Sequence, residues 1–288
     1  MPKITRVAVA QLCATPDVAE NLRIAGKLVR EAHTRDAEVV MLPEAFAFLG
    51  PEKEKRKILE RLPTDPYEKG GPIFEQCREL ACRYAVHLVL GGFHEDVDDP
   101  DKCFNTCVHL GPDGAIVARY RKIHLFDVQL SDGTQLNESA RTFAGEDIVT
   151  TEMPFGVLGL SVCYDVRFPY LYQSLVDRGA IAVTVPSAFT KTTGAVHWHV
   201  LLRARAIECQ SYVLAPAQHG NNWRKRFCYG HSLIIDPWGM IIAECDEGDG
   251  IAVADIDPDY VSKVRAELPS LCHRRSLDRN IREQSRLK

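Results

Sequence analysis

The stretch Val7-Ala8-Val9-Ala10 and the later run Glu38-Val39-Val40-Met41-Leu42 decide the fold. Both runs have the length and apolar character of buried strands. Between them, Asp17 and Glu20 form a D-x-x-E signal for the start of a helix. Apolar residues then repeat at helical spacing: Leu22, Ala25, Leu28, Val29 and Ala32. This strand–helix–strand unit, with Pro43 as the expected end of its second strand, predicts a parallel crossover of the kind found in α/β proteins.

The alternation of strands and helices continues along the rest of the chain. We expect further helices at 72–84, 171–178 and 198–209. We expect further strands at 87–90, 157–162, 181–185 and 212–215, and hairpins that turn at 111–114 and 236–239. No Pro/Gly/Ser-rich linker and no short repeat divides the sequence. The sequence therefore predicts one α/β domain over residues 1–275, followed by a polar C-terminal tail at 276–288.

Composition excludes several classes of protein. The chain has 288 residues, of which 45% are hydrophobic and 26% charged, so we expect neither disorder nor a fibrous protein. The net charge of −4 argues against a nucleic-acid partner. No apolar run approaches the roughly 18 residues of a membrane span, and the first residues do not have the pattern of a signal peptide. The expected compartment is the cytoplasm, and a mitochondrial pool stays open.

The ten cysteines do not predict a disulfide framework or a metal centre. They lie mostly in apolar runs, and no C-x-x-C motif occurs. We therefore expect reduced and mostly buried thiols. His197 and His199 are two residues apart in an expected helix, where such side chains point to different faces. No metal site is expected.

Three reactive side chains follow strand-like runs: Glu44, Lys122 and Cys163. The carboxyl ends of strands are where sites gather in α/β sheets. Each residue has an ordinary interpretation when it is taken alone. Glu44 could lie in a loop, Lys122 on the surface, and Cys163 in the core.

Taken together, these side chains form a set suited to acyl transfer: a thiol nucleophile, a carboxylate base and an ammonium group for an oxyanion. A histidine is not required, although His94, His124 and His197 are available. The motifs G-x-S-x-G, H-E-x-x-H, G-x-x-x-x-G-K-[ST] and G-x-G-x-x-G are absent from the sequence. Serine-hydrolase, metalloprotease, P-loop and Rossmann interpretations therefore lack support.

These residues lie in strings that resemble those of the nitrilase superfamily of carbon–nitrogen hydrolases. The resemblance extends over nearly the whole length of the chain. The resemblance is carried by an ordered set of strings: Ala8-Val9-Ala10-Gln11, Leu42-Pro43-Glu44, Tyr120 to Leu125, Glu138-Ser139, Val162 to Pro169, Pro186 to Phe189, Tyr229 to Ser232 and Asp236 to Gly239. Within the superfamily the chain is most similar to the Nit-type amidases, which occur alone or fused to a Fhit domain. The late strings Leu201 to Glu208 and Cys272 to Arg275 favour the branch that hydrolyses deaminated glutathione.

The resemblance implies catalytic roles for four side chains and one backbone amide. Cys163 would be the nucleophile and Glu44 the general base. Lys122 would hold the oxyanion together with the backbone N–H of Tyr164. Glu138 matches a second glutamate of the family, which positions the lysine and the substrate.

The resemblance also implies substrate contacts, a fold and an assembly. Arg167 matches an arginine that holds a substrate carboxylate, and Phe189 and Thr193 fall where relatives line the acyl pocket. His124 completes the expected substrate-binding set. The implied fold is a four-layer α-β-β-α sandwich, assembled at least as a homodimer, with no metal and no organic cofactor.

The expected activity is hydrolysis of deaminated glutathione to 2-oxoglutarate and cysteinylglycine through a cysteine thioester. The alternatives within the class are an ω-amidase acting on α-ketoglutaramate or a related small amide, and an N-carbamoyl hydrolase. Outside the class stand a non-catalytic interaction protein and a zinc or redox thiol protein. Two positions depart from the family pattern, because Tyr170 and His199 stand where relatives usually have glutamate.

Overall fold

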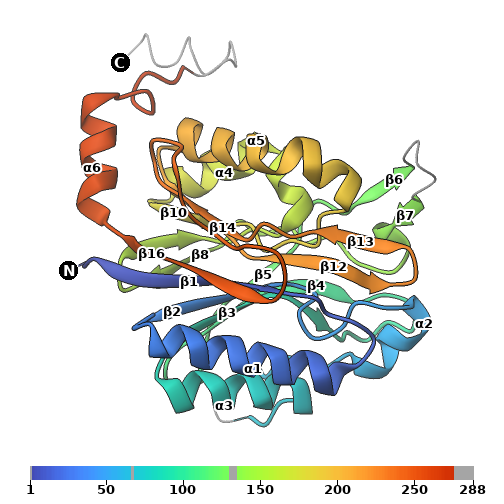
Figure 1. Ribbon diagram of the computed structural model, residues 1–288. Helices are drawn as coiled ribbons and strands as arrows, with labels where there is room; N and C mark the ends of the chain where they lie inside the picture. Colours follow the sequence, from blue (N-terminus) through green and yellow to red (C-terminus); the bar gives the residue numbers. More distant parts are fainter. Residues whose placement is uncertain (1, 66–67, 130–134, 276–288) are drawn as a thin grey trace.

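Two β-sheets pack face to face between two layers of helices in the computed structural model, which describes residues 2–65, 68–129 and 135–275 (Figure 1). Within these residues the first sheet has the strand order β13 (Arg226–Tyr229), β12 (Ala217–Trp223), β1 (Thr5–Leu12), β2 (Val39–Glu44), β3 (His87–Glu95), β4 (Phe104–Leu110) and β5 (Ile116–Arg121). β16 (Gly250–Ile256) also pairs with β1. The second sheet has the order β15 (Ile241–Glu244), β14 (Leu233–Ile235), β11 (Tyr212–Ala215), β10 (Ala182–Thr184), β9 (Gly156–Gly159) and β8 (Thr150–Met153).

The helical layers cover the outer faces of the two sheets. α1 (Val18–Thr34) and α3 (Pro72–Tyr84) lie on the first sheet, and α4 (Pro169–Asp177) and α5 (Lys191–Cys209) lie on the second (Figure 1). This arrangement confirms the expected four-layer α-β-β-α sandwich.

Alternation along β1 supplies side chains to two different cores. Val7 and Val9 belong to the cluster that includes the second sheet, whereas Ala8 and Ala10 belong to the cluster with α1 and α3. β1 pairs with β2 in parallel, with Val7 opposite Val39, so the predicted crossover is confirmed. The strand–helix–strand pattern therefore specifies both the crossover and the layer on which its helix lies.

The second strand continues past Pro43, which was predicted to end it, and stops at Glu44. β2 continues through Pro43 to Glu44, which pairs with Gly92 of β3. The pairing of β2 with β1 ends at Met41, so the missing N–H of Pro43 removes no bond on that side. Glu44 consequently belongs to a strand, which fixes its backbone more firmly than a loop would.

The predicted strand at 157–162 is also too long. β9 ends at Gly159, because the next amides bond to side chains: Ser161 N–H donates to Thr184 Oγ1 and Val162 N–H to Asp165 Oδ2. The chain thus leaves the sheet and enters a short 3-10 helix, η3 (Cys163–Arg167).

Helix α5 begins seven residues earlier than predicted, at Lys191. Thr190 caps it by accepting a hydrogen bond from the Thr193 amide. Gly194 obscured this start in the sequence, because glycine is a weak helix former. Tyr229 packs against it so closely that a Cβ at Gly194 would lie 2.3 Å from the Tyr229 Cβ.

The remaining described elements are short or peripheral: α2 (Glu52–Lys55), η1 (Arg56–Ile58), β6 (Asp127–Gln129), β7 (Gln135–Asn137), η2 (Glu138–Ala140) and α6 (Pro258–Glu267). The ten cysteines are free thiols and seven of them are buried, as expected. Among the described helices, none combines the length and the hydropathy that a membrane span requires. The polar tail 276–288 lies outside the described residues, and the assignment of a single domain to 1–275 stays a prediction.

Candidate active site

The structure brings the four predicted catalytic side chains to one cavity of about 270 Å³. Glu44 is the last residue of β2, Lys122 directly follows β5, Glu138 begins η2, and Cys163 begins η3. All four line this cavity. Strand ends and short helices from distant parts of the sequence therefore meet at one place, as the positions of the reactive residues predicted.

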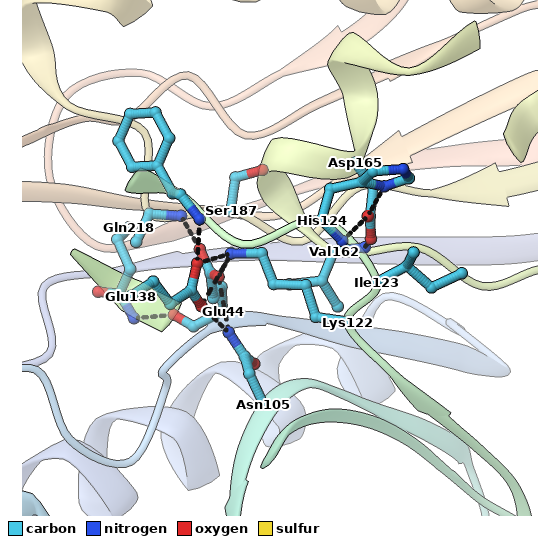
Figure 2. Close-up of polar contacts among 12 residues, drawn as sticks. Glu44, Asn105, Lys122, Ile123, His124, Glu138, Val162, Asp165, Ser187 and Gln218 are labelled. Atoms are coloured by element: carbon cyan, nitrogen blue, oxygen red, sulfur yellow. Dashed lines mark hydrogen bonds and ion pairs between the residues drawn. The ribbon is translucent and has the colours of Figure 1, made fainter. Parts of the chain in front are cut away.

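A buried ammonium group joins two carboxylates at the centre of the site (Figure 2). Lys122 Nζ lies 2.9 Å from Glu44 Oε1 and 2.8 and 3.1 Å from the two carboxylate oxygens of Glu138. Lys122 is only 2% exposed, so water contributes little to its solvation. The two carboxylates thus balance its charge and hold the ammonium at a fixed point.

Glu44 is oriented by further donors that sequence reasoning missed. Asn105, on β4, donates from Nδ2 to Glu44 at 2.9 Å and to Glu138 at 3.3 Å. The Ala188 amide donates to the other Glu44 oxygen at 2.9 Å. The sequence has no local signal for Asn105, because β4 contains two further polar residues, Thr106 and His109. These bonds leave the Glu44 carboxylate little rotational freedom.

The charges of the site settle which groups are ionised. Burial alone would raise the pKa of the Glu44 carboxyl, but the Lys122 charge and hydrogen bonds from Cys163, Lys122 and Asn105 together lower that pKa below its ordinary value. Burial alone would lower the pKa of the Lys122 ammonium, but attraction to Glu138 and Glu44 raises it well above its ordinary value. Near neutral pH the site therefore contains a carboxylate base beside a permanent cation.

Cys163 is a protonated thiol in this environment. Burial and the neighbouring Glu44 charge raise the pKa of its thiol well above the ordinary value, and the thiol hydrogen-bonds to Glu44. The residue has φ of 50°, a left-handed conformation that is uncommon for a side chain of this kind. Its amide donates to the Pro186 carbonyl at 2.9 Å, which fixes the turn. The thiol consequently needs a base in order to react, and Glu44 is in contact with it.

A second, smaller cavity adjoins the first across Cys163. Its lining includes the expected binding residues Tyr164, Arg167, Phe189 and Thr193. The Arg167 guanidinium lies 5.8 Å from the centre of the Tyr164 ring and 5.5 Å from that of Phe189. Cys163 lines both cavities, so its thiol lies where the two meet.

His124 is the expected binding residue that the structure places elsewhere. Its Nδ1 lies 2.6 Å from Asp165 Oδ1, its Nε2 contacts the Tyr170 hydroxyl, and its ring stacks on Phe168 at 3.7 Å. The described linings of the two cavities do not include it. In Figure 2 it faces Asp165, away from the Glu44 cluster. A role for His124 in substrate binding therefore stays a prediction, and its ring lies against Asp165, Phe168 and Tyr170.

Asp165 is a positioning residue that the sequence analysis did not identify. Its two oxygens accept hydrogen bonds from the amides of His124 and Val162 and from the Tyr120 hydroxyl. It is fully buried. Asp165 therefore ties the segment that carries Lys122 to the turn that carries Cys163.

The first cavity has a cationic wall that no motif revealed. Lys55, Arg141 and Arg226 line it together with the catalytic cluster. Lys55 pairs with Glu52 and Arg141 with Asp101. Arg226 Nε is buried and, among the described residues, has no hydrogen-bond partner. The Arg226 guanidinium therefore adds a positive charge to the wall of this cavity.

The shifted pKa of Glu44 predicts how stability depends on acid. A carboxyl whose folded pKa lies below the unfolded value of about 4.3 stabilises the fold above that pH. The contribution is lost as pH falls through the lowered folded pKa. As the pH is lowered below about 4.5, the free energy of unfolding should fall less steeply for Glu44→Gln than for the unmodified protein. Urea unfolding at a series of pH values measures both slopes, and equal slopes would contradict the assignment.

Comparison with known proteins agrees with this geometry. A family model described as carbon-nitrogen hydrolase matches residues 6–266. A deaminated glutathione amidase from Synechocystis sp. is 46% identical over 270 residues, which cover 93% of this chain and 97% of that protein.

Two solved structures have the same fold. The crystal structure of the NitFhit protein of Caenorhabditis elegans has a TM-score of 0.86 at 39% identity; the match covers 95% of this chain and 66% of that longer chain. The crystal structure of Saccharomyces cerevisiae Nit3, a member of branch 10 of the nitrilase superfamily, has a TM-score of 0.83 at 33% identity and covers 93% and 95% of the two chains. The family match over most of the sequence and these likenesses lead to one conclusion: the chain belongs to the carbon-nitrogen hydrolase family, within the nitrilase superfamily.

Proposed function

We propose that this protein is an amidase that hydrolyses deaminated glutathione to 2-oxoglutarate and cysteinylglycine. The observation that carries the proposal is the Cys163 thiol, which contacts the Glu44 carboxylate beside the Lys122 ammonium at the junction of two cavities. The identity to a protein named deaminated glutathione amidase supports the choice of substrate.

In the acylation step, Glu44 accepts the thiol proton while the Cys163 sulfur forms a bond to the amide carbonyl carbon. The carbonyl oxygen becomes an oxyanion, which Lys122 and the Tyr164 amide stabilise. Tyr164 lies in the first turn of η3, where amides lack partners within the helix. Glu44 then gives its proton to the leaving nitrogen as the carbon–nitrogen bond breaks, and cysteinylglycine departs.

In the deacylation step, water attacks the carbonyl carbon of the Cys163 thioester. Glu44 accepts a proton from this water, and the same oxyanion donors act again. The carbon–sulfur bond breaks, 2-oxoglutarate is released, and the proton on Glu44 returns to the sulfur. The raised pKa of Lys122 keeps it charged in both steps. Glu138 and Asn105 hold Lys122 and Glu44 in position.

The substrate has two carboxylates, and we place one toward each of the two cavities. One belongs to the 2-oxo acid end and the other to the terminal glycine, with the scissile amide between them. We assign the acyl half to the small cavity, where Arg167 provides a planar donor for its carboxylate. We assign the cysteinylglycine half to the larger cavity, whose lining includes the positively charged Arg226.

The experiment that tests the proposal compares two amides of 2-oxoglutarate with the purified enzyme. Release of 2-oxoglutarate is measured from deaminated glutathione and from α-ketoglutaramate under the same conditions. A larger kcat/KM for deaminated glutathione supports the proposal. A larger value for α-ketoglutaramate would make the protein an ω-amidase, and turnover of neither would remove the proposed activity.

Arg226 provides a prediction about substrate choice. Arg226→Gln is expected to raise KM for deaminated glutathione about tenfold, because one charge-assisted hydrogen bond of about 1.5–3 kcal/mol is lost. KM for α-ketoglutaramate, which lacks the glycine carboxylate, should change little. The matched control is Arg224→Gln, whose guanidinium stacks on Trp223 rather than lining the cavity. An equal rise in KM for both amides would contradict the assignment of Arg226 to the leaving half.

We further propose that the protein is a homodimer and acts in the cytoplasm. Exposed apolar side chains on α5 and around β15 support a dimer: Val196, Val200, Met240 and Ile242. Arg203 on α5 donates to the Gly239 carbonyl, which joins these two elements into one face. Light scattering gives the mass in solution, and cell fractionation gives the compartment.

A further inference from the structure

Three potential metal ligands converge outside the described linings of the two catalytic cavities. His199 comes from α5, His231 from the loop between β13 and β14, and Glu244 from the end of β15. His199 Nε2 lies 2.9 Å and His231 Nδ1 2.7 Å from the same oxygen, Glu244 Oε1. The ligand atoms of the three residues all lie within 4.8 Å of one another. The described linings of the two catalytic cavities include none of them.

We propose that His199, His231 and Glu244 form a binding site for a divalent transition-metal ion, with Zn²⁺ as the probe. Two imidazole nitrogens and one carboxylate oxygen are a donor set that zinc and its neighbours prefer over magnesium or calcium. The ion would replace the two hydrogen bonds that now join the imidazoles to Glu244. A small outward shift of the rings gives the ligand spacing that metal bonds of about 2.0–2.2 Å require.

The backbone and ring of His231 are held in place by its neighbours. The Trp198 indole donates to the His231 carbonyl at 2.8 Å. The Tyr229 ring lies 4.5 Å from the His231 ring, at an angle of 30°. His231 has φ of 59°, so its backbone is held in the left-handed region. Because these contacts position the imidazole before any ion arrives, binding would cost little conformational entropy.

His199 approaches from a rigid element. It lies within α5, a 19-residue helix, and the adjacent Trp198 side chain is buried. The His199 and His231 rings are 5.3 Å apart and inclined at 70°, so their nitrogens reach the carboxylate from different directions. A three-ligand geometry around one ion is therefore accessible from three separate elements without a change of fold.

In the single chain solvent reaches the cluster through a surface cavity beside the proposed dimer face, so an ion can enter the site and keep water as its remaining ligands. The side chains of His199, Glu244 and His231 are 30%, 31% and 42% exposed. A surface cavity of about 600 Å³ includes His231 and Glu244 in its lining. A site with three protein ligands and open positions fits this arrangement. The ion would link α5 to the second sheet and stabilise the folded state by mass action.

The test is calorimetric titration of Zn²⁺ into the full chain after treatment with a chelator. The Cys163→Ala variant is used throughout, so that the catalytic thiol cannot bind zinc. We expect one equivalent per chain. His199→Gln and Glu244→Gln should each weaken binding by at least about tenfold, since each removes one of three ligands. The matched control is His219→Gln: His219 pairs with Asp249 beside the same surface cavity but is not in the cluster, so its loss should not affect binding.

A second readout identifies the ligands directly. Cobalt(II) bound through imidazole nitrogen gives a visible absorption spectrum. This spectrum should appear with the Cys163→Ala protein, which is the starting protein here, and disappear when His199→Gln is added to it. Thermal unfolding should shift upward by several degrees with zinc in the starting protein and not in His199→Gln. The absence of one-equivalent binding, or equal affinity in the starting protein and His199→Gln, would overturn the proposal. Since no arm measures amide hydrolysis, the result is independent of the proposed amidase activity.

Discussion

Replacement of Cys163 by alanine is expected to lower turnover of deaminated glutathione by about 10⁴-fold or more, because removal of a catalytic nucleophile removes the covalent route. The fold should persist, since alanine is smaller than cysteine and the site keeps the Glu44–Lys122–Glu138 cluster. Steady-state kinetics measure the turnover, and circular dichroism measures the unfolding midpoint.

Cys107→Ala is the control that separates nucleophilicity from loss of a buried thiol. Cys107 is fully buried on β4 within the core between the sheets, and burial raises the pKa of its thiol to about 12. Its replacement should lower stability and leave turnover nearly unchanged. Retention of most of the activity in Cys163→Ala would show that another group attacks the amide.

Replacement of Lys122 by methionine is the second change with a large expected effect, and it acts on both stability and catalysis. The variant leaves Glu44 and Glu138 facing each other without their shared cation, which for a buried pair costs about 3–5 kcal/mol of unfolding free energy. It also removes an oxyanion donor, which costs about 10²–10³ in kcat. Urea unfolding and kcat, measured at a temperature where the variant is folded, give the two effects separately.

Two further variants keep this prediction testable. Lys263→Met breaks an exposed pair with Glu267 on α6, so it should change stability by less than about 0.5 kcal/mol. Lys122→Arg keeps the positive charge and should remain folded even if Lys122→Met does not. Since a guanidinium cannot occupy the same point as an ammonium, its kcat should still fall. A kcat close to that of the unmodified enzyme in Lys122→Arg would make the lysine a structural counter-ion only.

The sequence was sufficient to group three residues of the candidate site, because each of them follows an apolar segment and the structure places all three at one cavity. Glu44, Lys122 and Cys163 each follow a run whose strand character is evident from composition alone. The edge of a sheet then brings such residues together. The same reasoning gave the parallel crossover from β1 to β2.

The contacts that depend on side-chain direction could not be predicted in this way. Asn105 reaches Glu44 across 61 positions of sequence, and nothing local marks it as a partner. His124 follows Lys122 closely in sequence, but its ring is held by Asp165, 41 residues away. Arg226 enters the cavity from a strand that has no catalytic motif. These positions follow from the packing of the sheets, which a periodic pattern does not describe.

Tyr170 and His199, which depart from the family pattern, also make contacts that the sequence could not predict. Tyr170 contacts His124, outside the two described cavity linings, so its effect on the catalytic cluster is indirect. The divergence of His197 and His199 along α5 was predicted correctly: His197 contacts Arg167, and His199 faces Glu244. The sequence could not show that His231 meets His199 at that carboxylate.

The most direct test of the catalytic account is the chemical state of Cys163 during turnover. The enzyme is mixed with deaminated glutathione, quenched in acid within one turnover, digested, and analysed by mass spectrometry. The account predicts that the peptide containing Cys163 gains the mass of one 2-oxoglutaryl group, and that the thioester disappears as the substrate is consumed. Steady release of 2-oxoglutarate with Cys163 unmodified at every quench time, or with the acyl group on another residue, would contradict it.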